Sequence, residues 1–100
     1  MSIARRAHGD RVLVTFELPA TVTADHIVLV ADFNEWSTSA TPLIRHETGW
    51  SVTVQLRPGR TYRFRYLLDG ERWANDWSAD SYVPNTFGGD DSVLDLTRVE

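Results

Sequence analysis

The sequence predicts an all-β domain, a two-sheet antiparallel sandwich of about seven short strands. Three observations support this fold class. Apolar and polar residues alternate along several segments of the 100-residue chain, which is the pattern of half-buried strands. Turn-forming residues separate those segments at short intervals. No window shows the sustained helical periodicity of an amphipathic helix.

The first half of the chain is predicted to contain a lead-in and three strands. Residues 1–9 are polar and aperiodic, so we expect them to form a flexible N-terminal lead-in to a single domain over 10–100. Apolar side chains then occupy every second position from Val12 to Leu18, and Pro19 ends that strand. The apolar run at 27–31 is typical of a buried strand, and a short edge strand is expected to start at Leu43.

The second half is predicted to contain four strands, at residues 50–56, 62–68, 71–74 and 92–97. Pro58 and Gly59 lie between the first two, which are therefore expected to pair as a hairpin. Asp69-Gly70 is typical of a second tight turn. Residues 75–91 are interpreted as a loop. This number of strands in one small domain favours an immunoglobulin-like sandwich.

Composition argues against several classes of partner. The net charge of -4 disfavours a nucleic-acid partner, because such binding depends on neutralising phosphates. The chain has no Cys, and therefore no disulfide, thiolate nucleophile or Cys-based metal site. No apolar segment approaches the roughly 20 residues that span a bilayer, and none resembles a signal peptide. We expect no nucleic-acid or membrane partner, and a cytoplasmic location.

No group of residues indicates catalysis. His8, His26 and His46 are scattered singly and lack the spacing of metal ligands. Most carboxylates of the second half fall in turns, where Asp is favoured because it hydrogen-bonds the local backbone. No nucleophile elbow and no phosphate-binding glycine loop is present. The sequence therefore predicts a protein that is not an enzyme and that has no catalytic residue, metal or cofactor.

Four tryptophans in so short a chain need an explanation. Trp50 continues the alternation of its strand and is predicted to be a core residue. Trp36 and Trp73 each lie where a strand meets a turn, and each could either display a flat apolar face or cover the core. Trp77 is interpreted as filling a gap, with a third aromatic surface as the alternative. Exposed indoles beside Arg and amide groups favour sugar binding, because sugar C–H faces stack on rings while hydroxyls bond to polar groups.

The order of motifs adds a specific resemblance. The chain contains, in this order, Ala31-Asp32-Phe33-Asn34-Glu35-Trp36, then Tyr62-Arg63-Phe64-Arg65-Tyr66-Leu67-Leu68-Asp69-Gly70, Trp73, Asn75-Asp76, Tyr82-Val83-Pro84-Asn85 and Phe87-Gly88-Gly89-Asp90-Asp91-Ser92-Val93. Over roughly residues 10 to 97 this resembles the family 48 carbohydrate-binding modules. These include the glycogen-binding domain of the AMP-activated kinase β subunit and the early-set domains N-terminal to isoamylase and glycogen branching enzyme.

The resemblance implies an early-set sandwich that binds α-1,4-glucan (glycogen, starch or maltooligosaccharide) on an aromatic surface. Trp36 and Trp73 match the two stacking tryptophans of the family, and Arg65 stands where kinase-type members have a sugar-contacting lysine. Phe87 matches the apolar residue of the late loop. Asp91 stands where the family often has an Asn that contacts sugar hydroxyls, and an ionised Asp accepts hydrogen bonds without donating them.

A second function remains open at the level of the sequence. Early-set domains of many glucan enzymes pack on a neighbouring domain and touch no substrate, so the fold alone does not decide the function. The alternative is a protein-interaction or regulatory sandwich that has lost sugar binding. It would act through a glycogen-metabolising enzyme or other protein in trans, or through a homodimer at an exposed sheet edge.

Overall fold

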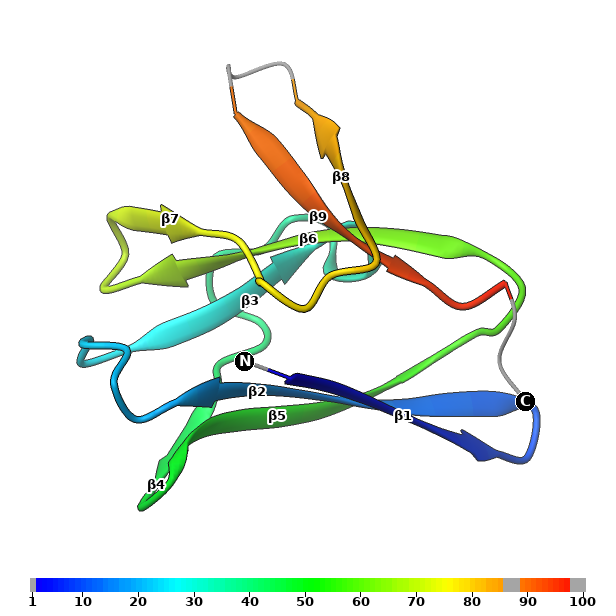
Figure 1. Ribbon diagram of the computed structural model, residues 1–100, viewed down its shortest axis with the longest axis horizontal. Helices are drawn as coiled ribbons and strands as arrows, with labels where there is room; N and C mark the ends of the chain where they lie inside the picture. The colour runs from blue at the N-terminus through cyan, green and yellow to red at the C-terminus, as the bar shows by residue number, and fades with distance from the viewer. Residues whose placement is uncertain (1, 86–88, 98–100) are drawn as a thin grey trace.

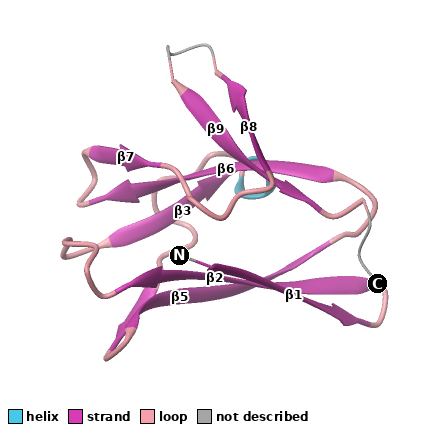
Figure 2. Ribbon diagram, in the orientation of Figure 1, coloured by secondary structure: helices cyan, strands magenta, loops and turns pink. Residues whose placement is uncertain are grey.

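The computed structural model describes residues 2–85 and 89–97, and this part of the chain forms two antiparallel sheets facing one another (Figures 1 and 2). Sheet A has the strand order β1 (Ser2–His8), β2 (Arg11–Pro19), β5 (Gly49–Leu56), β4 (Ile44–His46). Sheet B has the order β3 (Ile27–Ala31), β6 (Thr61–Leu68), β9 (Asp90–Asp95), β8 (Ser81–Pro84), and β7 (Arg72–Ala74) also pairs with β6. A 3-10 turn, η1 (Asp32–Asn34), follows β3. The all-β, two-sheet prediction is confirmed.

The hydrophobic core lies between the two sheets. The alternating residues of β2, from Val12 to Leu18, are buried against the inner side chains of β6. Phe16 of sheet A meets Phe64 of sheet B edge to face, with the ring centroids 5.1 Å apart. Trp50 is buried, as its position in the alternation predicts. No helix formed by the described residues is long and apolar enough to cross a membrane.

The expected flexible lead-in is instead an edge strand. β1 pairs antiparallel with β2 from Ser2↔Glu17 to His8↔Arg11. Its side chains are mostly exposed, so the segment lacks the apolar alternation that identifies a strand in sequence. This strand is held by main-chain hydrogen bonds to β2. Such bonds do not depend on the type of side chain, so the sequence shows no pattern that predicts the strand.

The predicted hairpin between residues 50–56 and 62–68 is also wrong. β5 pairs with β2 and β4, whereas β6 pairs with β3, β7 and β9, so the connection crosses from one sheet to the other. Gly59, with φ 85°, donates its N–H to Leu96 O at 2.8 Å, and Leu96 N–H is bonded to Arg60 O at 3.0 Å. The Pro-Gly signal marks a reversal of the chain but does not say whether its two arms pair with each other.

Part of the predicted loop at 75–91 is a strand. β8 (Ser81–Pro84) pairs with β9, and together they form the hairpin that rises away from the other strands in Figure 1. β8 is short, largely exposed and ends in proline, so neither alternation nor propensity marks it. β9 begins at Asp90, two residues before the predicted start of the last strand at Ser92.

The Asp69-Gly70 turn joins β6 to β7 and is anchored to the two residues that precede β3. Both residues have positive φ, 54° and 71°, which is the geometry of a type I′ hairpin turn. Asp69 Oδ1 accepts the N–H groups of Asp25 at 2.7 Å and His26 at 2.9 Å. These bonds favour the ionised carboxylate, with a smaller contribution from Arg72, and lower the pKa of Asp69 below its ordinary value of 3.8.

Asp69→Asn is expected to destabilise the protein near neutral pH and to matter less in acid. A lowered folded-state pKa contributes stability above the unfolded pKa, and this contribution is lost as the pH falls through the folded value. Thermal unfolding at about pH 7 and about pH 3 measures the change. Asp10→Asn is the control, because the Asp10 side chain is 89% exposed and forms an ion pair with its neighbour Arg11. A destabilisation equal at both pH values would contradict the expectation.

Candidate functional site

An open groove of about 980 Å³ lies on the outer face of sheet B. We call it the aromatic groove. Its volume is at the upper end of the range usual for ligand sites in proteins. Its lining comes from β3 and the segment that follows it, and from β6, β7 and the β8–β9 hairpin. It consists of Val30, Trp36, Thr38, Arg63, Arg65, Trp73, Pro84, Asn85, Gly89 and Asp91.

Strand β6 supplies the floor of the groove. Successive side chains of a strand point to opposite faces, so Tyr62, Phe64 and Tyr66 enter the core while Arg63 and Arg65 face outward. β3 lies on one side of β6, and β9 and β7 follow each other along the other side. This arrangement brings segments that are distant in sequence to one outer face.

The turn that carries Trp36 is built on Asn34. Asn34 Oδ1 accepts the Ala31 N–H at 3.0 Å, and its Nδ2 donates to Leu29 O at 2.8 Å and to Thr41 Oγ1 at 3.1 Å. The amide side chain therefore replaces strand pairing where β3 ends. The Trp36 N–H, bonded to Ala31 O at 2.7 Å, closes the turn.

Within the Phe33-Asn34-Glu35-Trp36 turn, the two aromatic residues point in different directions. Phe33 turns toward the core and meets Tyr62 edge to face at 5.8 Å. Glu35 and Trp36 both adopt left-handed backbone conformations, with φ of 59° and 57°. This region is unfavourable for a bulky side chain such as Trp, and strained residues of this kind cluster at functional sites. The turn thus holds the Trp36 indole, 41% exposed, over the groove.

Trp73 forms another aromatic wall. It sits in the short strand β7 opposite Leu67 of β6, and its side chain is 46% exposed. The guanidinium of Arg65 lies over its ring, with Cζ 5.1 Å from the ring centroid. This contact has the geometry of a cation–π interaction and fixes the two side chains against each other.

A polar cluster closes the groove on the side of the β8–β9 hairpin. Arg63 Nη2 lies 3.0 Å from Asp91 Oδ2 and also donates to Pro84 O at 3.2 Å. Asn85 Nδ2 donates to Asp91 Oδ1 at 3.1 Å. Asp91 is 5% exposed, so both of its oxygens are engaged in a nearly dry setting. Its carboxylate holds Arg63 and Asn85 in place along the groove.

A second polar cluster supports the groove from inside the sandwich. Asp76 is fully buried, where it accepts the Tyr66 hydroxyl at 2.6 Å and the Ser78 N–H at 2.7 Å. Burial and the nearby Asp76 charge raise the pKa of Tyr66 well above its ordinary value, so the phenol stays protonated as a donor. The Asp76 N–H bonds Ser92 Oγ at 3.0 Å and ties the loop after β7 to β9.

The structure brings together four of the five residues predicted to contact sugar. Trp36, Arg65, Trp73 and Asp91 all line the aromatic groove. The fifth, Phe87, lies outside the described residues. Sequence reasoning did not select the other lining residues, namely Val30, Thr38, Arg63, Pro84, Asn85 and Gly89. Strand alternation could have identified Arg63, because it lies two positions from Arg65 on the same face.

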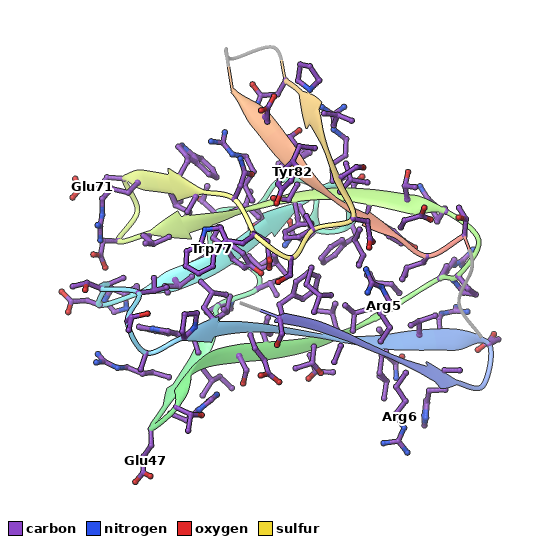
Figure 3. All side chains as sticks on the ribbon, in the orientation of Figure 1. Arg5, Arg6, Glu47, Glu71, Trp77 and Tyr82 are labelled. Carbon is purple, nitrogen blue, oxygen red and sulfur yellow. The ribbon has the colours of Figure 1, made fainter. Side chains whose placement is uncertain are left out.

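Trp77 does not fill a gap, contrary to the interpretation of the sequence. Its side chain is 70% exposed, and it lies on the loop between β7 and β8 (Figure 3). It is not among the residues that line the aromatic groove. The core beneath this loop is covered by smaller side chains, including Ala74 and Ala79.

Comparison with known proteins gives no family for the chain: no protein-family model and no curated protein matches it. Within the described part of the chain, no group of three or more His, Cys, Asp or Glu residues is placed to hold a metal ion. The polar and aromatic groups that line the groove are two indoles, two guanidinium groups, an amide, a threonine hydroxyl and an engaged carboxylate.

Asn34→Ala is expected to lower the free energy of unfolding by about 1–3 kcal/mol, because it leaves part-buried backbone groups of Ala31 and Leu29 without partners. Urea unfolding measures the loss, and a shift of Trp emission in the folded state reports displacement of Trp36. Asn34→Asp is the matched variant: it keeps the acceptor for Ala31 and loses the donors, so an intermediate stability is expected. If Asn34→Ala has the same free energy of unfolding as the wild type, the amide does not hold the turn.

Proposed function

We propose that the protein is a non-catalytic binding module for α-1,4-glucan, such as glycogen, starch or a maltooligosaccharide, and that the aromatic groove receives the sugar. One observation carries the proposal. Trp36 and Trp73 belong to different parts of the chain, yet both are partly exposed and both line one groove with Arg63, Arg65 and Asn85. The motif resemblance to the family 48 carbohydrate-binding modules adds independent support from the sequence.

The groove provides both kinds of contact that a sugar requires. The apolar C–H faces of successive glucose units would stack on the Trp36 and Trp73 rings. Guanidinium N–H groups of Arg65 and the Asn85 amide would bond the hydroxyls at the sugar edges. Trp73 already carries Arg65 on its ring, so stacking and hydrogen bonding would occur side by side.

Affinity for a short oligosaccharide is expected to be weak. An open groove covers only part of a flexible sugar, and much of the stacking energy offsets the loss of sugar freedom. Dissociation constants in the micromolar to millimolar range would suffice on a polymer, because a glucan chain presents many sites in succession.

The alternative, a protein-interaction module that has lost sugar binding, is less well supported. Such a module would be expected to present a large apolar face without converging polar groups. The aromatic groove instead combines its two rings with two arginines, an amide and a threonine hydroxyl. This mixture favours a ligand rich in hydroxyl groups.

Titration with maltoheptaose and with β-cyclodextrin, followed by intrinsic Trp fluorescence, tests the proposal. The wild type is expected to give a saturable change, and Trp36→Ala or Trp73→Ala is expected to weaken binding by about tenfold or more, since each removes a stacking face. Trp77→Ala is the matched control, because it removes a more exposed indole that does not line the groove.

Circular dichroism of each variant establishes that the fold is intact. A flat response of the wild type to both sugars would overturn glucan binding and favour the interaction module. Equal losses in Trp36→Ala and Trp77→Ala would show that the sugar binds outside the aromatic groove.

A further inference from the structure

The aromatic groove is positively charged in a protein that is negatively charged overall. Its lining contains two arginines, Arg63 and Arg65, and a single carboxylate, Asp91. Asp91 balances Arg63 through their 3.0 Å ion pair, so one positive charge remains in the groove. The complete chain has a net charge of -4, so the positive charge is a local property of the groove.

That remaining charge belongs to Arg65. No carboxylate in the described part of the chain forms an ion pair with it. Its guanidinium lies over the Trp73 ring, which attracts the cation but accepts no in-plane N–H bond. Its Nε is buried and has no acceptor among the described residues, and the same holds for Nε of Arg63.

The groove is therefore rich in donors and poor in acceptors. Guanidinium groups only donate hydrogen bonds. The oxygens of Asp91 are occupied by Arg63 and Asn85, and Asn85 Oδ1 accepts the Gly89 N–H at 3.2 Å. The Thr38 hydroxyl is a further acceptor in the lining. A neutral sugar hydroxyl is both donor and acceptor, so it would still find few acceptors here. A ligand group made of acceptor oxygens with negative charge would suit the terminal N–H groups of Arg65.

We infer that the aromatic groove binds α-glucans that carry a phosphate monoester more tightly than it binds the neutral polymer, and that Arg65 binds the phosphate group. A phosphate monoester carries a charge of about −1.5 to −2 near neutral pH and three acceptor oxygens, which matches an arginine without a carboxylate partner. The inference rests on the proposed function, because the sugar still stacks on Trp36 and Trp73.

The test compares phosphorylated maltooligosaccharides with the same preparation after phosphatase treatment, so that the two ligands differ only in the ester. Isothermal titration of the full chain is expected to give about tenfold tighter binding of the phosphorylated form, as one charge-assisted contact would provide. Because this contact is partly exposed, raising the salt concentration from about 0.05 M to about 0.5 M is expected to reduce the preference.

Arg65→Gln is expected to abolish the preference, whatever its effect on neutral sugar, while Arg65→Lys, which keeps the charge, is expected to retain part of it. Arg45→Gln is the matched control: Arg45 also lies over an indole, with Cζ 5.3 Å from the Trp50 ring centroid, but it does not line the groove. The Arg45→Gln variant is expected to prefer the phosphorylated form as strongly as the wild type does.

The outcomes separate the inference from the proposed function. Equal binding of both preparations would overturn the phosphate preference and leave glucan binding standing. No binding of either would overturn the proposed function itself. Oligosaccharides that carry a uronate in place of the ester distinguish the source of the charge: weaker binding than the phosphorylated form supports the phosphate, and equal binding overturns its assignment.

Discussion

Strand β6 is the constraint on which the rest of the structure depends. The two-residue period of its side chains sends Tyr62, Phe64 and Tyr66 into the core and leaves Arg63 and Arg65 on the outer face. Its backbone pairs with β3 on one side and with β9 and β7 on the other. A shift of one residue in this register would bury two guanidinium groups and expose three aromatic rings, so the core and the groove are fixed by the same pairing.

Polar side chains extend this order to the irregular segments around the groove. Asn34 replaces strand pairing after β3, Asp69 anchors the β6–β7 turn, and Asp76 joins the loop after β7 to β6 and β9. Each supplies acceptors to backbone or hydroxyl groups that would otherwise lack partners, which is the condition for keeping loops of this kind in one conformation. The walls of the groove are loops and short strands, and they are held by this small number of side chains.

The electrostatic character of the groove follows from an imbalance in pairing. Arg63 has Asp91 as a partner, whereas Arg65 contacts a ring. Asp91 therefore acts as an organising residue that positions Arg63 and Asn85, which differs from the direct sugar contact that the resemblance implies for this position. An ionised Asp at this position accepts hydrogen bonds and pairs with Arg63, whereas the neutral amide of an Asn would form no ion pair.

The sequence by itself determined the fold class, most strand positions and the burial of Trp50. These follow from local patterns, because alternation and turn residues act over a few positions. The motif resemblance singled out Trp36, Arg65, Trp73 and Asp91, and these four residues line one groove. Only the tertiary structure decided the pairing of β1, the separation of β5 and β6 into different sheets, the strand β8 and the exposure of Trp77. The physical reason is that edge pairing and sheet membership depend on contacts between distant segments, and neither leaves an apolar period in the chain.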